Sequence, residues 1–118
     1  MFFKKGQTAY VIDASKRKYS LIECTIMFEK EGIIKAKGGR EAPYVFKYSE
    51  TVKDLNGFFT DSFKEYFLSD DYDKCFRLVE KHNLRADILE ILRKRSSEIS
   101  IEQLKRVKDF LENIKCEL

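Results

Sequence analysis

The amino-acid sequence predicts an α+β protein in which a β-rich part, residues 1–68, is followed by an α-rich part, residues 69–118. Apolar side chains alternate with polar ones before residue 69, as in half-buried strands, and recur at helical spacing after it. All five glycines and the single proline also precede residue 69. A chain of 118 residues has the length of one domain, and we expect both parts to form one compact unit.

Five strands are expected in the β-rich part, at residues 8–13, 19–29, 33–37, 44–49 and 63–68. The second has the clearest alternation, which predicts that Ile22, Cys24, Ile26 and Phe28 face the core. Gly32 is expected to take a positive φ in a tight reversal before the third strand. Residues 50–62 are expected to be irregular, and two phenylalanines within them to fold back onto the body.

Three helices are expected in the α-rich part, at about residues 69–82, 85–95 and 101–115. Ser69, followed by two aspartates, is a candidate N-cap of the first helix, because its hydroxyl can accept from free backbone amides. Asn83 is the expected stop between the first two helices. Ser100 and Gln103 have the spacing of a capping box and predict the start of the third.

Residues 3–13 are a basic-glycine turn followed by an apolar strand, and residues 67–72 are a strand-to-helix step. Together with the order of five short strands, these segments resemble small SH3-like barrel proteins of bacteria, phages and mobile elements. The similarity covers residues 3–72. It implies a five-stranded antiparallel barrel or strongly bent sheet that binds protein or nucleic acid, and it supplies no active-site residues.

The charge and cysteine content indicate a cytoplasmic protein. The net charge of +3 comes entirely from residues 1–68, with 12 basic and 9 acidic side chains, whereas residues 69–118 hold 11 of each. Three cysteines without a C-x-x-C motif favour reduced thiols over a disulfide scaffold. We find no signal-peptide pattern and no apolar window of about 20 residues, so we expect no membrane association.

The sequence favours a protein that is not an enzyme and that uses no metal or small-molecule cofactor. His82 is its single histidine, which leaves a His-based metal site without ligands. Cys75 lies seven residues before His82, so a thiol–imidazole pair on one helix face is conceivable. We favour packing of Cys75 in the core, because it continues the apolar stripe of its helix.

A candidate nucleic-acid surface consists of basic side chains of the barrel with one aromatic residue for stacking. The alternative is a solvated face without a ligand. The residues of this candidate surface are Lys16, Arg17, Lys18, Tyr19, Lys35, Lys37, Arg40 and Lys47.

A candidate partner surface lies on the last two predicted helices, which offer more apolar positions than a small barrel needs. These positions would either pack on the barrel or contact a second copy or another protein. We expect a non-enzymatic protein-interaction or regulatory module, and nucleic-acid binding is the alternative function. The residues of this candidate surface are Leu84, Ile88, Leu92, Leu104 and Leu111.

Overall fold

The computed structural model describes residues 2–47, 58–61 and 63–114, and it confirms the α+β class. The chain divides into two compact units, Met1–Ala86 and Asp87–Leu118. The boundary falls within a long helix. The described residues form six strands and two helices, so the expected five strands and three helices were wrong in number.

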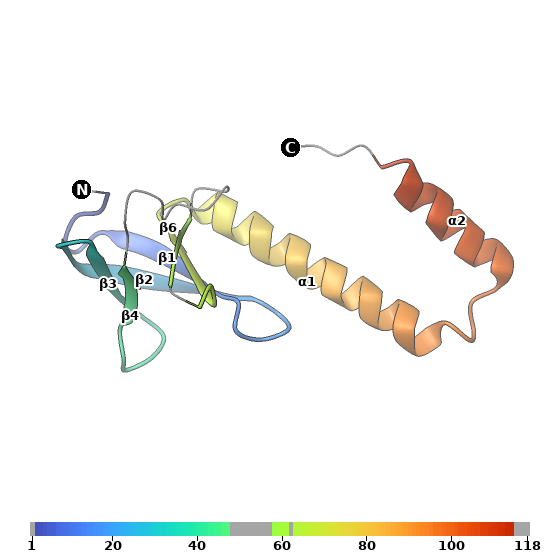
Figure 1. Cartoon of the computed structure of the whole chain (residues 1–118), viewed down its shortest axis with the longest axis horizontal. Coiled ribbons are helices and arrows are strands. Elements are labelled where there is room, and N and C mark those ends of the chain that lie inside the picture. The colour runs from blue at the N-terminus through green and yellow to red at the C-terminus, as the bar shows by residue number, and fades with distance from the viewer. Residues whose placement is uncertain (1, 48–57, 62, 115–118) are drawn as a thin grey trace. The chain divides into compact units, whose positions relative to one another are not determined.

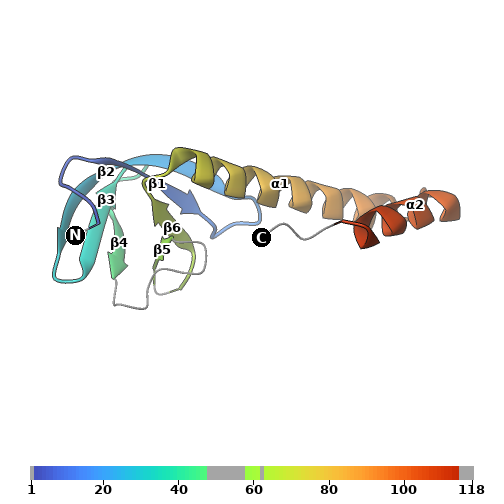
Figure 2. The ribbon, with the colours of Figure 1, turned by 90° about the horizontal axis from the view of Figure 1, so that it is seen from above.

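The first unit contains a six-stranded antiparallel sheet with the order β4-β3-β2-β1-β6-β5 (Figure 1). Its edge strands β4 and β5 lie next to each other, so the sheet curls into a nearly closed barrel (Figure 2). This architecture is compatible with an SH3-like barrel. The strands are β1 Thr8–Asp13, β2 Ser20–Lys30, β3 Ile33–Lys37, β4 Tyr44–Lys47, β5 Phe59–Thr60 and β6 Tyr66–Ser69.

The sixth strand arises where the sequence predicts an irregular stretch. In β5, Phe59 pairs with Leu68 of β6. A two-residue strand is too short to show any periodicity, so the sequence gives no sign of it. The expected strand at 63–68 starts later, at Tyr66, because the Asp61 carboxylate accepts from the amides of Glu65 and Tyr66 in a turn. Phe59 is buried, as expected, and residues 48–57 lie outside the described part.

The β2–β3 hairpin forms as predicted. Glu31 and Gly32 occupy its two-residue turn with φ values of 53° and 77°. Positive φ at both central positions gives a turn whose twist matches that of the flanking strands, and Gly32 adopts it without steric cost.

A β-bulge in β2 overturns one prediction. Ile26 pairs with Ala36 of β3, but the next partners are Phe28 and Lys35, so the register shifts at Met27. Ala36 is fully buried, whereas Lys35 is only half-buried. Phe28 therefore lies on the outer side of the sheet and not in the core, because the extra residue reverses the alternation beyond it.

Two apolar clusters stabilise the first unit. Ile12, Phe58 and Cys75 form the smaller cluster between the outer side of the sheet and the start of helix α1 (Tyr72–Arg95). Val11 and Ile12, which are neighbours in β1, thus belong to different clusters, since successive side chains point to opposite sides of a strand. The larger cluster fills the barrel and consists of Phe3, Ala9, Val11, Cys24, Ile26, Ile34, Ala36, Tyr44, Phe46, Phe59 and Leu68.

Helix α1 begins later than predicted and continues through the expected stop. Ser69 belongs to β6, and the N-cap is Asp71, whose carboxylate accepts from the Lys74 amide at 3.1 Å. Asn83 lies within the helix. Its side chain accepts from the Tyr19 amide at 2.8 Å and donates to the Tyr19 carbonyl at 3.0 Å. A residue that often ends helices instead anchors α1 to the β1–β2 loop, which joins two predicted helices into one.

The second unit contains the last turns of α1 and helix α2 (Ile101–Glu112). The predicted capping box is confirmed, with the Ser100 hydroxyl accepting from the Gln103 amide and the Gln103 side chain accepting from the Ser100 amide. All residues of α2 are exposed. The described part of this unit therefore contains no buried core, unlike the barrel.

Candidate functional site

Three of the predicted basic residues share the outer side of β3 and β4, and we call Lys35, Lys37 and Lys47 the lysine face. The residues that alternate with them along both strands are buried in the barrel. Lys35 lies opposite Val45 of β4, and Lys47 lies opposite Ile33 of β3. Cross-strand partners are about 5 Å apart and next-but-one residues of a strand about 7 Å, so the three side chains share one face of these two strands.

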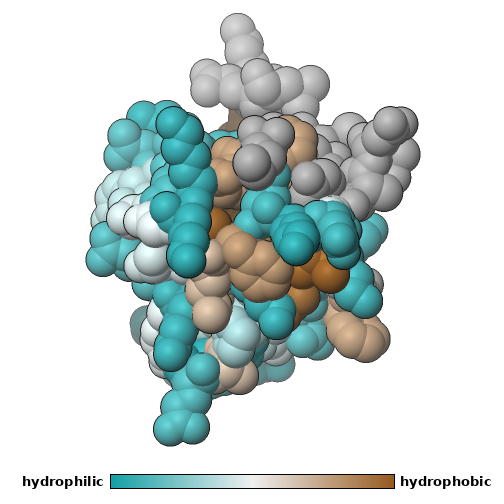
Figure 3. Space-filling model, turned by 90° about the vertical axis from the view of Figure 1, so that its left-hand side faces the viewer, coloured by the Kyte–Doolittle hydropathy of each residue, from teal (hydrophilic) through white to brown (hydrophobic). Residues whose placement is uncertain are grey.

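A pocket of about 460 Å³ adjoins this surface, and we call it the N-terminal pocket. Figure 3 shows this side of the barrel, with apolar surface among hydrophilic side chains. The Lys35 ammonium lies 5.4 Å from the centre of the Phe28 ring and thereby joins the pocket to the lysine face. The pocket is lined by Phe2, Phe3, Lys4, Lys5, Gln7, Phe28 and Glu29.

The sequence analysis did not predict this pocket, because it placed Phe28 in the core and assigned no ligand to the first five residues. One signal was present. Ile26, Met27 and Phe28 are three consecutive apolar residues that follow the alternation of residues 22–26, and such an interruption is typical of a bulge.

The remaining predicted nucleic-acid residues are not part of this surface. Residues 16–18 lie in the turn between β1 and β2, at the end of β2 that is opposite to the β2–β3 turn. The ring of Tyr19 stacks on His82 with 3.5 Å between the ring centres and 6° between the planes. Nε2 of His82 lies 2.8 Å from the Arg17 carbonyl oxygen, to which it donates. Tyr19 thus fixes helix α1 and does not offer this ring face to a base.

Arg40 has a structural position at one end of the barrel. Its guanidinium lies 3.8 Å from the ring centre of Tyr44 and 5.2 Å from that of Tyr66, and it donates to the carbonyl oxygen of Ala42. Burial raises the pKa of Tyr44, an effect that the nearby positive charge of Arg40 partly offsets. Arg40 therefore joins β4 to β6 through two aromatic rings.

The predicted partner residues are largely exposed. The exposed fractions are 55% for Leu84 and 56% for Ile88, and 40% for Leu104 and 58% for Leu111, whereas Leu92 is half-buried. Leu84 and Ile88 are four residues apart in α1, and Leu104 and Leu111 are seven apart in α2, so each pair lies on one stripe of its helix. Unpartnered apolar stripes on helices are a common mark of association.

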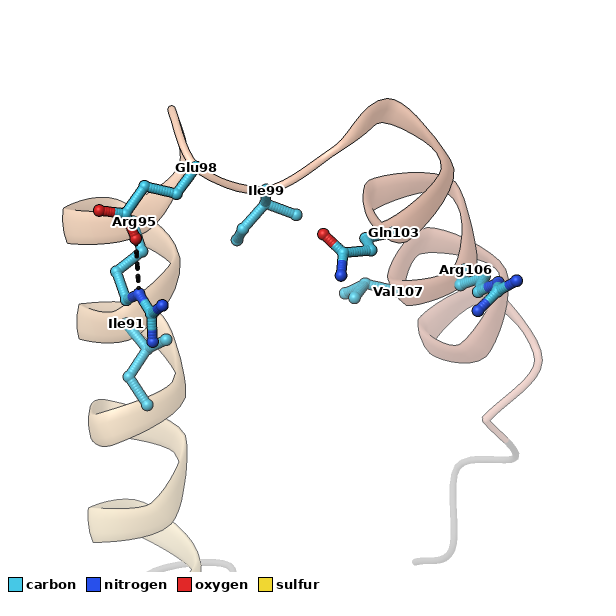
Figure 4. A pocket seen from close by; sticks show the side chains of 7 residues that line it. All are labelled: Ile91, Arg95, Glu98, Ile99, Gln103, Arg106 and Val107. Atoms are coloured by element: carbon cyan, nitrogen blue, oxygen red, sulfur yellow. Dashed lines mark hydrogen bonds and ion pairs between the residues drawn. The ribbon is translucent and has the colours of Figure 1, made fainter.

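A second pocket lies between the end of α1 and the start of α2, with a volume of about 500 Å³ (Figure 4). Ile91 of α1 and Val107 of α2 point into it from the two helices, and Ile99 of the connector lies between them. Arg95 donates to the Glu98 carboxylate at 2.9 Å at the edge of the pocket. The two helices are thus separated by an open, partly apolar groove with charged edges.

Few described groups have the chemistry of a reactive centre. Cys24 and Cys75 are free and buried, and burial raises the pKa of each thiol to about 11. Thiols of raised pKa are poor nucleophiles near neutral pH. Cys75 packs against Ile12 and Phe58, as the core interpretation expects. No group of three or more metal-ligating side chains occurs in the part of the chain that the structure describes.

Three comparisons with known proteins complete the description of these surfaces. Models of protein families, curated proteins and solved structures all gave no match to the chain. Within residues 2–47, 58–61 and 63–114, no helix has both the length and the apolar character needed to span a membrane.

Proposed function

We propose that the chain is a non-enzymatic protein-interaction module that associates through its helical unit, with a second copy of the chain as the partner. One observation supports this proposal above the others. The apolar stripe of α2 has no buried member, although its helix is well capped. An isolated 12-residue helix is marginal in water, so an amphipathic helix of this length gains most of its stability from packing on an apolar surface.

The available area fits an interface between two copies. Nine large apolar side chains between residues 88 and 114 are exposed by 37–69%. At roughly 100 Å² for each, they offer on the order of 900 Å², against about 800 Å² per partner in a stable interface. Pairing of the two grooves would bury these side chains in a four-helix arrangement.

The charge of the unit also fits self-association. Residues 87–118 carry seven basic and seven acidic side chains, so two copies of this unit do not repel each other through net charge. The excess of +3 lies within residues 1–86. A partner with a strong net charge of one sign would bind best to a helical unit with the opposite net charge. This unit has equal numbers of basic and acidic side chains, so it does not favour such a partner.

The test measures the molar mass of the purified protein by light scattering over a wide range of concentration. The wild type is expected to dimerise. A variant with Leu104→Asp and Leu111→Asp is expected to weaken the dimer about a hundredfold or more, because each interface would bury four new carboxylates.

A matched control carries the same new side chain one position further along α2. Lys105→Asp with Glu112→Asp changes the net charge by the same two units, but on the polar side of the helix. Its dimer dissociation constant is expected to stay within a few fold of that of the wild type. A wild type that stays monomeric at every concentration contradicts the proposed partner. A Leu104 and Leu111 variant that only lowers the melting temperature shows that these residues are core, and it contradicts the proposed surface.

A further inference from the structure

We propose that the barrel binds single-stranded nucleic acid, with phosphates along the lysine face and a base in the N-terminal pocket. This function is separate from association through the helical unit, since it uses residues 2–47 only.

The lysine face offers a cluster of cations to a phosphate backbone. Lys37 and Lys47 are exposed, Lys35 is half-buried, and Lys37 lies opposite Thr25 of β2. Their cross-strand neighbours Val45 and Ile33 are apolar, so among the described strand residues no carboxylate lies directly opposite any of the three lysines. Lysines on one face attract phosphates, and their binding releases the counterions that the phosphates hold.

The N-terminal pocket adds aromatic surface next to this charge. Phe2 is 49% exposed, and its ring meets that of Phe59 edge to face at 4.9 Å between the centres. Such a contact leaves ring surface exposed to the pocket. Lys4 and Lys5 also line the pocket and are exposed.

Glu29 is the one acidic residue among the described residues that line the pocket, and backbone amides hold its carboxylate. The Glu29 carboxylate accepts from the amide of Phe2 at 2.9 and 3.1 Å and from the amide of Phe3 at 3.0 Å. These bonds fix the N-terminal segment against β2, and they direct the negative charge of Glu29 towards backbone donors. The lysines of the pocket therefore remain its outward-facing charges.

A single strand fits this surface better than a duplex or an acidic protein does. The rings of Phe2 and Phe28 can stack only on a base that is not already paired and stacked within a helix. Acidic side chains of a protein segment would use the lysines but have no flat ring to stack on the aromatic surface of the pocket. The contact of Lys35 with Phe28 brings a charge and a ring together, as a nucleotide requires.

The test uses fluorescence anisotropy of a labelled oligothymidine and of a duplex of equal length, at about 50 and 200 mM salt. The wild type is expected to bind the single strand at least about tenfold more tightly than the duplex, since stacking on one base typically contributes a factor of this size. Its affinity is expected to fall steeply with salt.

Two triple variants with equal changes of charge separate the lysine face from general basicity. Lys35→Glu with Lys37→Glu and Lys47→Glu is expected to abolish binding at 200 mM salt and to make the salt slope shallower by about 2, since each lost contact removes about 0.7. Glu substitution of residues 16–18, in the turn between β1 and β2, is the control and is expected to bind nearly as the wild type does.

A third variant tests the pocket by itself. Phe2→Ala is expected to weaken single-strand binding about tenfold with the salt slope unchanged, because it removes a ring and no charge. Melting temperatures show that each variant is folded. Equal loss in the two triple variants overturns the proposal, as does duplex binding as tight as single-strand binding. Unchanged affinity of the Phe2 variant overturns the placement of a base in the pocket.

Discussion

The barrel and the helical unit use similar proportions of apolar residues in opposite ways. In the barrel, eleven residues form one buried cluster, and a second cluster lies beneath the start of α1. In the described part of the helical unit, the apolar side chains are exposed or half-buried. The barrel therefore carries its own stability, whereas the helical unit has apolar surface that a partner can still bury.

The same substitution in the two regions gives the sharpest contrast. Leu68→Ala removes a fully buried side chain from the barrel and is expected to lower the free energy of unfolding by about 2–5 kcal/mol. Leu111→Ala removes a side chain that is 58% exposed and is expected to change the free energy of unfolding by less than about 0.5 kcal/mol. Urea denaturation of dilute protein measures both. Equal losses would show that α2 has a core of its own.

Asn83 is expected to have the next largest effect, because it links α1 to the barrel. Asn83→Ala removes two hydrogen bonds and leaves the amide and carbonyl of Tyr19 without these partners, at a cost of about 2 kcal/mol. Arg85→Ala, two positions further along α1 on an exposed side chain, serves as the control and is expected to be nearly neutral. A neutral Asn83 variant would mean that packing alone holds α1 on the barrel.

Alkaline pH is expected to weaken the barrel through its buried thiols. Burial raises the pKa of Cys24 and of Cys75 from 9.0 to about 11, so the unfolded chain loses these protons at lower pH than the folded one. The stabilisation is complete below pH 9 and is lost as the pH rises to about 11, at roughly 1 kcal/mol per pH unit for each thiol. Denaturation of the wild type and of Cys75→Ala over this pH range measures how much of the lost stability comes from Cys75. An equal loss of unfolding free energy in both proteins would contradict a contribution from Cys75.

The last expected effect is confined to the helical unit. Ser100→Ala removes the capping box of α2 and is expected to destabilise that helix by about 1 kcal/mol. Because α2 has no buried residue, the loss is expected as lower helicity in circular dichroism and faster amide exchange in α2, while the barrel keeps its melting temperature. A lower melting temperature of the barrel would show that the two units unfold together.

The sequence by itself determined the features whose causes are local. The alternation of β1 and β3 follows from the two-residue period of a strand, and the positive φ of Gly32 follows from a two-residue turn. The capping box of Ser100 and Gln103 needs only a spacing of three residues. Each of these features depends on neighbours in the chain, so a pattern in the sequence is sufficient to predict it.

Only the tertiary structure decided the features whose causes are distant in the chain. Asn83 lies within α1 and does not end it, because its partner Tyr19 is 64 residues away. Phe59 forms a strand because Leu68 offers it a pairing edge. Phe28 lies outside the barrel because the register with β3 shifts at a bulge, and this shift created the pocket that we assign to a base. Contacts of this kind form only when distant parts of the chain meet in the folded protein, so local periodicity in the sequence does not predict them.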